Sequence, residues 1–330
     1  MKIISGIQPS GKLHIGNYLG AIKNWIKLQN DSENECAFFV ADYHSITEEF
    51  DPKEKPKEIL DLATSLLALG LDPEKSIIFQ QSQVPGHADL AWIFDTLVKI
   101  PELERMTQFK DKAAAQKENI NMGLFGYPVL MAADILIHKA DAVPVGEDQT
   151  QHLELTRDIA RRFNNNFGPT FPEPKSLLTE TPRIMSLVDP SKKMSKSGGE
   201  KSYIALFDSP EIIKEKIKSA VSDTGGGKDK RIGGDNLLAI FDAFAETKEE
   251  KNEYSNYKRE HADGKLKYSE FKPRLAELIA NHFADFRNRY AELSENPDQV
   301  KKILDSGAKK ASAIAEKTLR EAKQKIGLII

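Results

Sequence analysis

The sequence predicts an α/β protein that begins with a parallel sheet and ends in helices. Over the first third of the chain, apolar runs that fit buried strands alternate with stretches of helical periodicity. Strand, helix and strand in succession favour parallel pairing through right-handed crossovers. Beyond residue 202 the apolar spacing is mainly helical. Together these observations indicate a Rossmann-like first part followed by a helical part.

Four segments are the candidate strands. Residues 2–5 form a short one that ends next to a glycine, and 36–41 is a continuous apolar run, which fits a strand buried on both faces. Residues 76–80 and 140–145 complete the set. Cys36 opens the second strand and is expected to be a small core residue.

Helices are expected between these strands. Apolar residues recur at helical spacing over 15–26 and 59–66, and Gly70 stands where a C-cap glycine belongs. A helical insertion around 102–139 interrupts the alternation, with Pro128 in the first turn of its last helix.

Two later segments are expected to be irregular. Residues 163–182 are rich in Pro, Asn and Gly, and residues 222–235 contain five glycines. The second segment should therefore be a loop.

Composition limits the partners only loosely. The chain has 330 residues, enough for one large domain or two modest ones. Its net charge is −3, so binding to a nucleic acid would need a local basic surface. Residues 301–330 offer one, with eight Lys or Arg against three acidic residues, although charge alone favours a solvated helix face.

The cysteine count and the apolar runs bear on compartment. The single cysteine, Cys36, excludes a disulfide framework and a cysteine-rich zinc site, and no protein-bound metal is predicted. Residues 1–8 do not read as a signal peptide, and no apolar run is long enough to cross a membrane. We therefore expect a cytoplasmic protein that does not bind a membrane.

The first candidate motif is GIQPSGKLHIGNYLG at residues 6–20, which follows the first strand and opens the first helix. A helix N-terminus offers free N–H groups and a positive dipole end to a phosphate. The glycine spacing and Lys12 resemble a P-loop, but Leu13 replaces the Ser or Thr that would bind magnesium. The alternative is residues 14–17, His-Ile-Gly-Asn, which are similar to the His-Ile-Gly-His signature of class I aminoacyl-tRNA synthetases.

The second motif, Lys-Met-Ser-Lys-Ser at residues 193–197, decides between these interpretations because it is the other class I signature in complete form. Gly198 and Gly199 follow it, so we expect a mobile loop. Two lysines three residues apart can close on a triphosphate as point charges. A solvated basic loop is the competing interpretation, and the pairing of both signatures in the expected order argues against it.

Asp134 is the one acidic residue in the otherwise apolar helical stretch 127–139. A buried carboxylate needs a hydrogen-bond donor. One candidate donor is His138, one helical turn further on. The other is a ligand N–H such as that of indole, which has only a donor to offer. Physical reasoning alone supports both donors equally.

Longer segments resemble bacterial tryptophanyl-tRNA synthetases. They are GIQPSG at 6–11, ELERMTQFK at 102–110, MAADIL at 131–136, PVGEDQ at 144–149 with HLELTRDIA after it, and RIMSL at 183–187. These segments extend across the predicted catalytic half, and the length of the chain fits the family. The sequence is thus identified as a member of this family of class I aminoacyl-tRNA synthetases.

The resemblance implies a role for each matching residue. In the tryptophan site Asp134 would accept the indole N–H, and the pocket would be lined by Tyr127, Met131, His44, Val145 and Gln149. The catalytic cations would be Lys193, Lys196 and Lys112. The ATP site would consist of Gln8, Pro9, Ser10, Gly16, Asn17, Gly146, Glu147, Asp148, Ile184, Lys193, Met194, Ser195, Lys196 and Ser197.

Two residues depart from the pattern of the family. His14 stands where relatives often have Thr, and Ile4 stands where an aromatic residue can wall the indole. The resemblance therefore does not define a role for His14, and it does not define how tightly the pocket encloses the indole at Ile4.

The implied function is tryptophan–tRNA ligation in two steps, with L-tryptophan, ATP and the tRNA for tryptophan as partners. Tryptophan would attack ATP to give tryptophanyl-adenylate and pyrophosphate, and the tRNA would then take the amino acid. Mg²⁺ would accompany ATP with few dedicated protein ligands. The implied domain plan is a catalytic domain at 1–190, a mobile loop at 191–200 and a helical tRNA-binding domain at 201–330, in a homodimer.

Three alternatives stay open. A tyrosyl-tRNA synthetase has the same two signatures, but the Asp134 segment and GEDQ argue against it. Another nucleotidyltransferase of this fold would lack the helical last third. A catalytically silent RNA-binding paralogue would not need Lys193 and Lys196.

Overall fold

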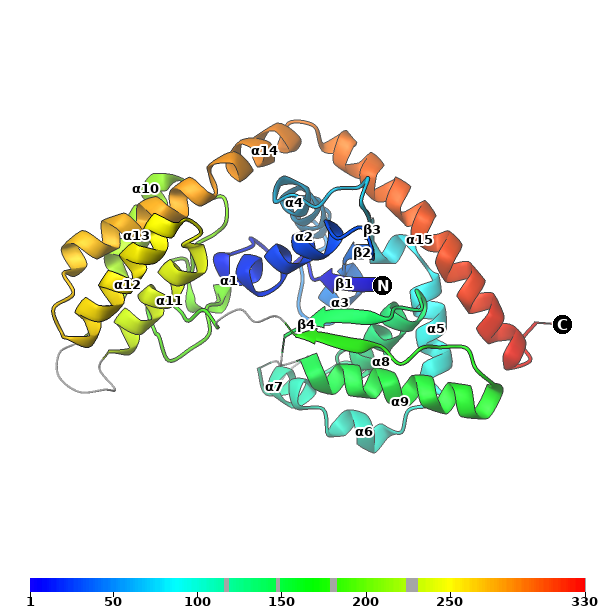
Figure 1. Ribbon diagram of the computed structural model, residues 1–330. Coiled ribbons are helices and arrows are strands. Elements are labelled where there is room, and N and C mark those ends of the chain that lie inside the picture. The colour runs from blue at the N-terminus through cyan, green and yellow to red at the C-terminus, as the bar shows by residue number, and fades with distance from the viewer. Residues whose placement is uncertain (116–118, 147–148, 179–182, 224–230, 330) are drawn as a thin grey trace. The chain divides into compact units, whose positions relative to one another are not determined.

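A computed structural model describes residues 1–115, 119–146, 149–178, 183–223 and 231–329 (Figure 1). The chain divides into two compact units. The sheet unit consists of Met1–Gly11, Asn24–Thr179 and Leu293–Ile330, and the helical unit consists of Lys12–Lys23 and Glu180–Glu292. These two units do not coincide with the three predicted segments, which are a catalytic domain at 1–190, a loop at 191–200 and a tRNA-binding domain at 201–330. The predicted segments describe functions and stay a prediction.

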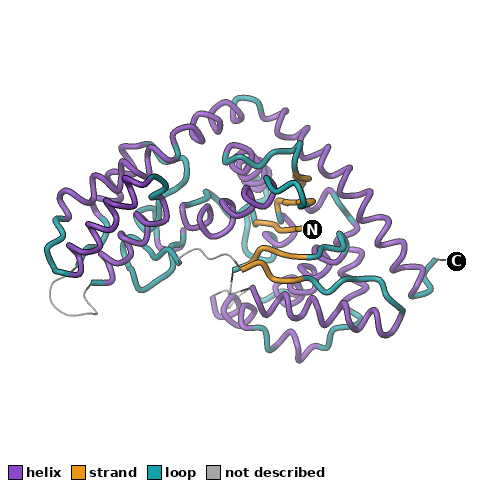
Figure 2. The backbone as a smooth tube through the Cα atoms, viewed as in Figure 1, coloured by secondary structure: helices purple, strands orange, loops and turns teal. Residues whose placement is uncertain are grey.

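The sheet unit is built on five parallel strands. They are β1 (Lys2–Ile7), β2 (Glu35–Val40), β3 (Ser76–Gln80), β4 (Ala142–Val145) and β5 (Lys175–Leu178), in the order β3-β2-β1-β4-β5. Ile3 of β1 lies opposite Cys36 on one side and Ala142 on the other. Figure 2 shows the strands together with helices around them. The predicted parallel α/β class is confirmed, and so are the four predicted strands.

The fifth strand was not expected, because residues 163–182 were predicted to be irregular. In the structure α9 (Thr150–Phe167) covers the start of this segment, and β5 pairs with β4 near its end. Three of the four β5 residues are exposed, so the strand carries no run of buried apolar side chains that a sequence pattern could reveal.

Helices surround the sheet within its unit. They are α2 (Lys23–Gln29), α3 (Asp42–Ser45), α4 (Lys55–Ala68), α5 (Gly86–Asp95), α6 (Ile100–Glu104), α7 (Thr107–Ala115), α8 (Met122–Leu136), α9 and α15 (Pro297–Lys325), with a short 3-10 turn, η2, at Gln81–Gln83. The last helix, α15, packs against β3, α4 and α5 (Figure 1). Gly307 permits this contact, because a Cβ atom there would stand 1.8 Å from the carbonyl oxygen of Ile78.

Pro128 was predicted in the first turn of a helix, and this prediction was wrong. The helix α8 begins six residues earlier, at Met122, and Pro128 lies inside it. Its start is set by Asn121, whose side chain accepts a hydrogen bond from the N–H of Leu124 at 2.9 Å.

The helical unit packs around aromatic side chains. It contains α1 (Ile15–Asn17), the π-helical segment η1 (Tyr18–Ile22), α10 (Pro210–Ser219), α11 (Ile232–Phe244), α12 (Lys248–Ala262) and α13 (Tyr268–His282), and α14 (Ala284–Ser294) follows. Phe241, Phe244, Phe271 and Phe283 are fully buried. The loop predicted at 222–235 ends earlier than expected, because α11 starts at Ile232; residues 224–230 lie outside the described part. No helix in the described ranges is both long and apolar enough to cross a membrane.

Candidate active site

The carboxyl ends of the strands in the sheet unit bring several predicted residues to one edge. Gln8 follows β1, His44 lies in α3 just after β2, and Val145 ends β4. The strand order changes direction between β1 and β4, since β2 and β3 lie on one side and β4 and β5 on the other. In parallel α/β sheets such a switch point at the carboxyl edge is the usual place for a ligand.

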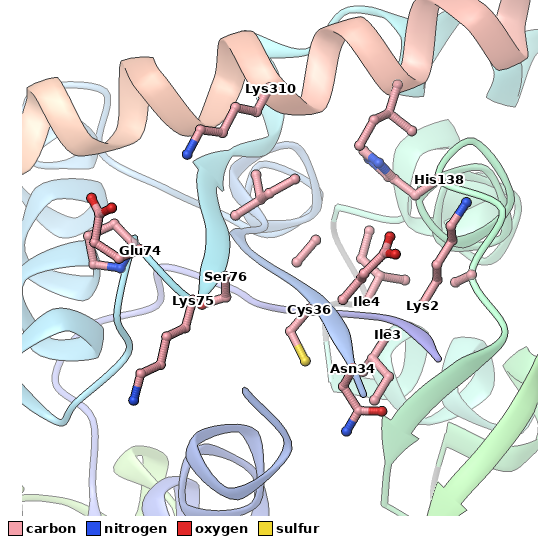
Figure 3. Close-up of a pocket in the computed structure, with 16 residues that line it drawn as sticks. Lys2, Ile3, Ile4, Asn34, Cys36, Glu74, Lys75, Ser76, His138 and Lys310 are labelled. Atoms are coloured by element: carbon pink, nitrogen blue, oxygen red, sulfur yellow. The ribbon is translucent and has the colours of Figure 1, made fainter. Parts of the chain in front are cut away.

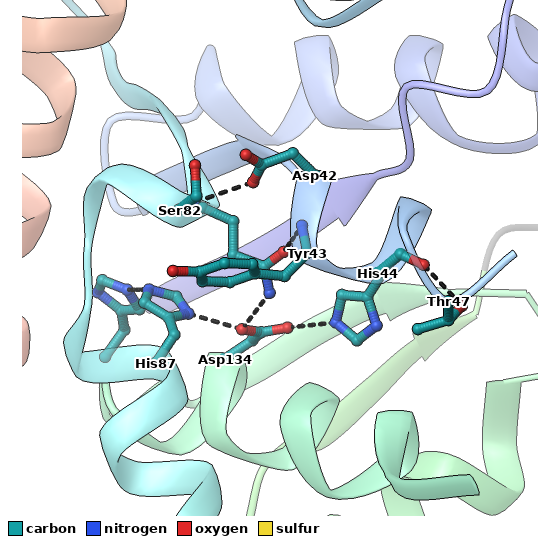
Figure 4. A network of polar contacts seen from close by, with 9 residues as sticks. Asp42, Tyr43, His44, Thr47, Ser82, His87 and Asp134 are labelled. Atoms are coloured by element: carbon teal, nitrogen blue, oxygen red, sulfur yellow. Dashed lines mark hydrogen bonds and ion pairs between the residues drawn. The ribbon is translucent and has the colours of Figure 1, made fainter. Parts of the chain in front are cut away.

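Asp134 is the centre of a buried hydrogen-bond network at this edge (Figure 4). Its Oδ1 lies 2.7 Å from Nε2 of Gln81 and 2.6 Å from Nδ1 of His87. Its Oδ2 lies 2.7 Å from Nε2 of His44. The carbonyl oxygen of the Gln81 side chain accepts from the N–H of Tyr43 at 3.1 Å, which turns the amide N–H₂ toward the carboxylate.

These contacts correct the proposed structural partner of Asp134. His138 does not bond to the carboxylate; its Nε2 lies 3.1 Å from Nε2 of His87 instead. His138 is not one helical turn away from Asp134, because α8 ends at Leu136 and His138 lies beyond the end of the helix.

The network keeps Asp134 ionised. Burial by itself would raise the pKa of this carboxyl group, but hydrogen bonds from His44 and His87 outweigh burial and hold its pKa well below the ordinary value. An ionised carboxylate has about four acceptor positions. Three donors from the described residues reach it, so Oδ2 can accept one more.

Tyr127 and His152 form a second polar contact beside this network. Its hydroxyl lies 2.9 Å from Nε2 of His152, and its ring centroid lies 6.2 Å from that of His44. Burial, followed by the charges of two acidic neighbours, raises the pKa of Tyr127 above its ordinary range. Lys112 lies over the Tyr127 ring at 5.1 Å and pairs with Glu48 at 2.7 Å. A phosphate role for Lys112 would therefore require it to leave Glu48.

The other predicted residues of the sheet unit lie as follows. Val145 is buried, Met131 packs against the hydrophobic core, and Gln149 directly precedes α9. Pro9 is buried, and its carbonyl oxygen accepts from Lys55 at 3.3 Å. Glu147 and Asp148 lie outside the described residues.

The two short signature motifs both lie in the helical unit. His14 caps α1: its Nδ1 accepts from the N–H of Gly16 at 3.2 Å, and its own N–H donates to Asn17 at 3.0 Å. Burial, and then the charges of Lys196 and Lys193, lower the pKa of His14 to about 4. His14 is therefore neutral at physiological pH and is within electrostatic range of both lysines.

Backbone hydrogen bonds fix the 193–197 segment to the chain before it. The N–H of Met194 donates to the carbonyl oxygen of Ile184 at 3.0 Å, and both side chains are buried. The hydroxyls of Ser195 and Ser197 lie 2.9 Å apart. A 3-10 turn at Lys196–Gly198 ends at Gly199, whose φ of +87° suits glycine. Lys193 is exposed and precedes this turn, and Lys196 is half-buried at its start.

A family model described as tRNA synthetases class I (W and Y) matches residues 1–284. The chain belongs to this family. A tryptophan–tRNA ligase from Clostridium tetani is 46% identical over 333 residues, which cover 99% of this chain and 96% of that protein. The tryptophanyl-tRNA synthetase of Mycoplasma pneumoniae has a solved structure with a TM-score of 0.86 and 36% identity, covering 99% of this chain and 97% of that one.

A further structure of this class I family is that of the tryptophanyl-tRNA synthetase from Campylobacter jejuni, complexed with ADP and tryptophan. It has a TM-score of 0.83 and 37% identity, covering 99% of this chain and all of that one, at 100%. The prediction of a class I aminoacyl-tRNA synthetase made from the two signatures is confirmed.

Sequence reasoning missed four polar residues that contact the predicted site residues. Gln81 and His87 donate to Asp134, His152 contacts Tyr127, and Glu48 pairs with Lys112. One signal could have found Gln81: a polar residue directly after a buried strand lies at the carboxyl edge of a parallel sheet. His87 and His152 carry no comparable local signal.

Proposed function

We propose that this chain is a tryptophan–tRNA ligase with Asp134 as the residue that selects tryptophan. The observation that carries the proposal is the buried, ionised carboxylate with one acceptor position left on Oδ2. Indole is an apolar ring with a single N–H donor, so it complements an apolar pocket that contains one acceptor. Relatives that align with nearly the whole chain are named as tryptophan–tRNA ligase and tryptophanyl-tRNA synthetase, and these names support tryptophan as the amino acid.

In the first step the carboxylate of tryptophan attacks the α-phosphorus of ATP, and the bond to pyrophosphate breaks. In the second step the terminal hydroxyl of the tRNA attacks the adenylate and releases AMP. Catalysis in our proposal comes from alignment and from cations that meet the charge growing on pyrophosphate. Lys193 and Lys196 supply these cations, and Mg²⁺ enters as part of the MgATP substrate. The ADP in the related structure from Campylobacter jejuni supports the nucleotide site.

The first test of the function is pyrophosphate exchange. We expect purified protein to incorporate labelled pyrophosphate into ATP when tryptophan is added, and not with tyrosine or without an amino acid. Exchange driven by tyrosine would identify the sister enzyme, and an absence of exchange with every amino acid would favour the silent paralogue.

We further propose that the protein is a homodimer. Three large apolar side chains of the sheet unit are strongly exposed: Trp92 at 74%, Ile100 at 64% and Met122 at 78%. They lie on α5, α6 and α8, and α8 packs against both other helices. Large exposed apolar side chains on helices that pack together fit an interface between subunits.

Sedimentation should therefore give about twice the monomer mass of 36.9 kDa. Trp92→Glu should shift the equilibrium toward monomer, because it places a charge in the apolar interface. Ile212→Glu is the matched control, since Ile212 is also exposed, at 43%, but lies on α10 of the helical unit. A fully active monomer at all concentrations would argue against this proposal.

The helical last third is our proposed tRNA-binding part. Its basic side chains on the outer face of α15 include Lys302, Lys309 and Lys317, all exposed. Such a face would neutralise phosphates of the tRNA backbone. Because the net charge of the chain is −3, a local basic surface is needed for this contact. A cytoplasmic location accords with this function and remains a prediction.

A further inference from the structure

A buried serine that follows the second signature motif contacts the motif from behind. Ser202 is fully buried, and its hydroxyl lies 2.7 Å from the carbonyl oxygen of Ser195 and 2.7 Å from that of Gly199. These two residues flank the 3-10 turn that begins with Lys196. A hydroxyl has one proton, and a bond to either oxygen ties Ser202 to this turn. The N–H of Ser202 adds a bond to the carbonyl oxygen of Gly199 at 2.9 Å.

Gly198 allows Ser202 to come this close to the turn. A Cβ atom at position 198 would stand 2.8 Å from both Cβ and Oγ of Ser202, so a side chain there would push the hydroxyl away. The φ of Gly198 lies outside the left-handed region, so glycine is needed at this position for space and not for its conformation. The turn and Ser202 are therefore fitted closely to each other.

The segment 202–206, which starts with Ser202, also pairs with the first signature motif. The N–H of Ile15 donates to the carbonyl oxygen of Ile204 at 3.0 Å. The N–H of Leu206 donates to the carbonyl oxygen of Leu13, also at 3.0 Å. All five residues of the segment are buried, and both motifs belong to the helical unit. The segment 202–206 thus connects the second signature motif to the first.

A buried ion pair anchors this segment to α10. Nζ of Lys216 lies 2.7 Å from Oδ2 of Asp208, and the same oxygen accepts from the N–H of Ala205 at 3.0 Å. The ammonium group of Lys216 also lies over the ring of Tyr203, 4.8 Å from its centroid. These contacts hold the backbone of the segment without the hydroxyl of Ser202. The loss of that hydroxyl should therefore leave the segment itself in place.

We propose that Ser202 is a positioning residue for Lys196: its hydroxyl fixes the signature turn to the segment 202–206, which is paired with the first motif. The carbonyl group of Ser195 belongs to the peptide bond that leads into Lys196, so a rotation of this peptide would redirect the lysine. The inference rests on the proposed function, in which Lys196 meets the charge growing on pyrophosphate. Stabilisation of this charge depends on alignment, so a displaced ammonium group lowers the rate without weakening the binding of tryptophan.

The test is tryptophan-dependent pyrophosphate exchange with Ser202→Ala, which removes the hydroxyl and keeps the backbone hydrogen bonds. We expect kcat to fall about tenfold while the KM for tryptophan stays at the wild-type value, because the misplaced cation matters only in the transition state. Gly198→Ala keeps the hydroxyl but displaces it, and it should lower kcat in the same way. This second variant carries the test where Ser202→Ala does not fold.

Ser76→Ala is the matched control for the loss of a buried hydroxyl. Ser76 is also buried, and its hydroxyl lies 3.0 Å from Oε1 of Gln29 and 3.1 Å from the carbonyl oxygen of Asp72. It lines a cavity of about 430 Å³ at the amino ends of β1, β2 and β3, the edge of the sheet opposite to the proposed tryptophan site (Figure 3). This variant should keep the kcat of wild type.

A second measurement shows whether Ser202 acts through Lys196. In the Lys196→Ala background no ammonium group is left to position, so Ser202→Ala should lower kcat by less than about twofold further. A purely structural role of the hydroxyl would give the same loss in both backgrounds. The comparison thus separates positioning from general loosening of the helical unit.

Three outcomes would overturn the inference. They are a wild-type kcat in folded Ser202→Ala, an equal loss of kcat with and without Lys196, and a raised KM for tryptophan at unchanged kcat. A failure of the proposed function is distinguishable from these outcomes. In that case tryptophan would drive no exchange in wild type, whereas a failure of the inference leaves wild-type exchange intact.

Discussion

Replacement of Lys196 by alanine should lower the kcat of tryptophan activation by on the order of 10²-fold or more, with little change in the KM for tryptophan. The reason is that negative charge on pyrophosphate grows only as the bond to the α-phosphorus breaks. A cation that meets this charge stabilises the transition state and not the bound amino acid. Lys196 is half-buried at the start of the 3-10 turn in the signature, and its charge contributes to the lowered pKa of His14, which caps α1.

Lys192→Ala is the matched control for this measurement. Lys192 is in the same segment but is strongly exposed and pairs with Asp189 at 3.0 Å. It should leave both kcat and KM unchanged, because an exposed pair of this kind contributes little. A Lys196→Ala enzyme that lost affinity for tryptophan at full kcat would contradict a role in the transition state.

The fold could be predicted where burial and secondary structure coincide. Strands β2 and β3 are buried on both faces, so their residues form apolar runs in the sequence. Strand β5 is at the edge of the sheet, with exposed side chains, and its pairing with β4 is made by the backbone. Backbone pairing leaves no trace in the choice of side chains, which is why this strand was missed.

The site could be predicted only in part, for a related reason. Asp134 is conspicuous because an acid in an apolar helix needs partners. Its partners are 47 to 90 residues away in the chain, and only the fold brings them together. His138 was a candidate donor to Asp134 because it is four residues further along the chain. Since α8 ends at Leu136, this spacing does not place the two side chains on one helix face. Local spacing thus located the carboxylate but not its donors.

Asp134→Asn should have the largest effect on specificity. In wild type, phenylalanine leaves one acceptor position of the buried carboxylate without a donor, while Gln81, His87 and His44 still donate to it. The loss of one charge-assisted hydrogen bond, together with the smaller ring, should give discrimination of about 10³- to 10⁴-fold against phenylalanine. In the variant, the amide that replaces the carboxylate has only one acceptor oxygen, and its N–H₂ group faces side chains that donated to the carboxylate.

Tryptophan activation should therefore fall strongly in Asp134→Asn, and the ratio between tryptophan and phenylalanine should narrow by about tenfold or more, since a neutral amide loses less when it is left unpaired. The measurement is kcat/KM for both amino acids in both proteins, with the KM for ATP as the internal reference. Asp42→Asn is the matched control: Asp42 is a second buried carboxylate, but its partners are Gln80 and Ser82. The control should keep the wild-type ratio. An unchanged ratio in folded Asp134→Asn would mean that the carboxylate only holds its histidines in place, and that selection of tryptophan lies elsewhere in the pocket.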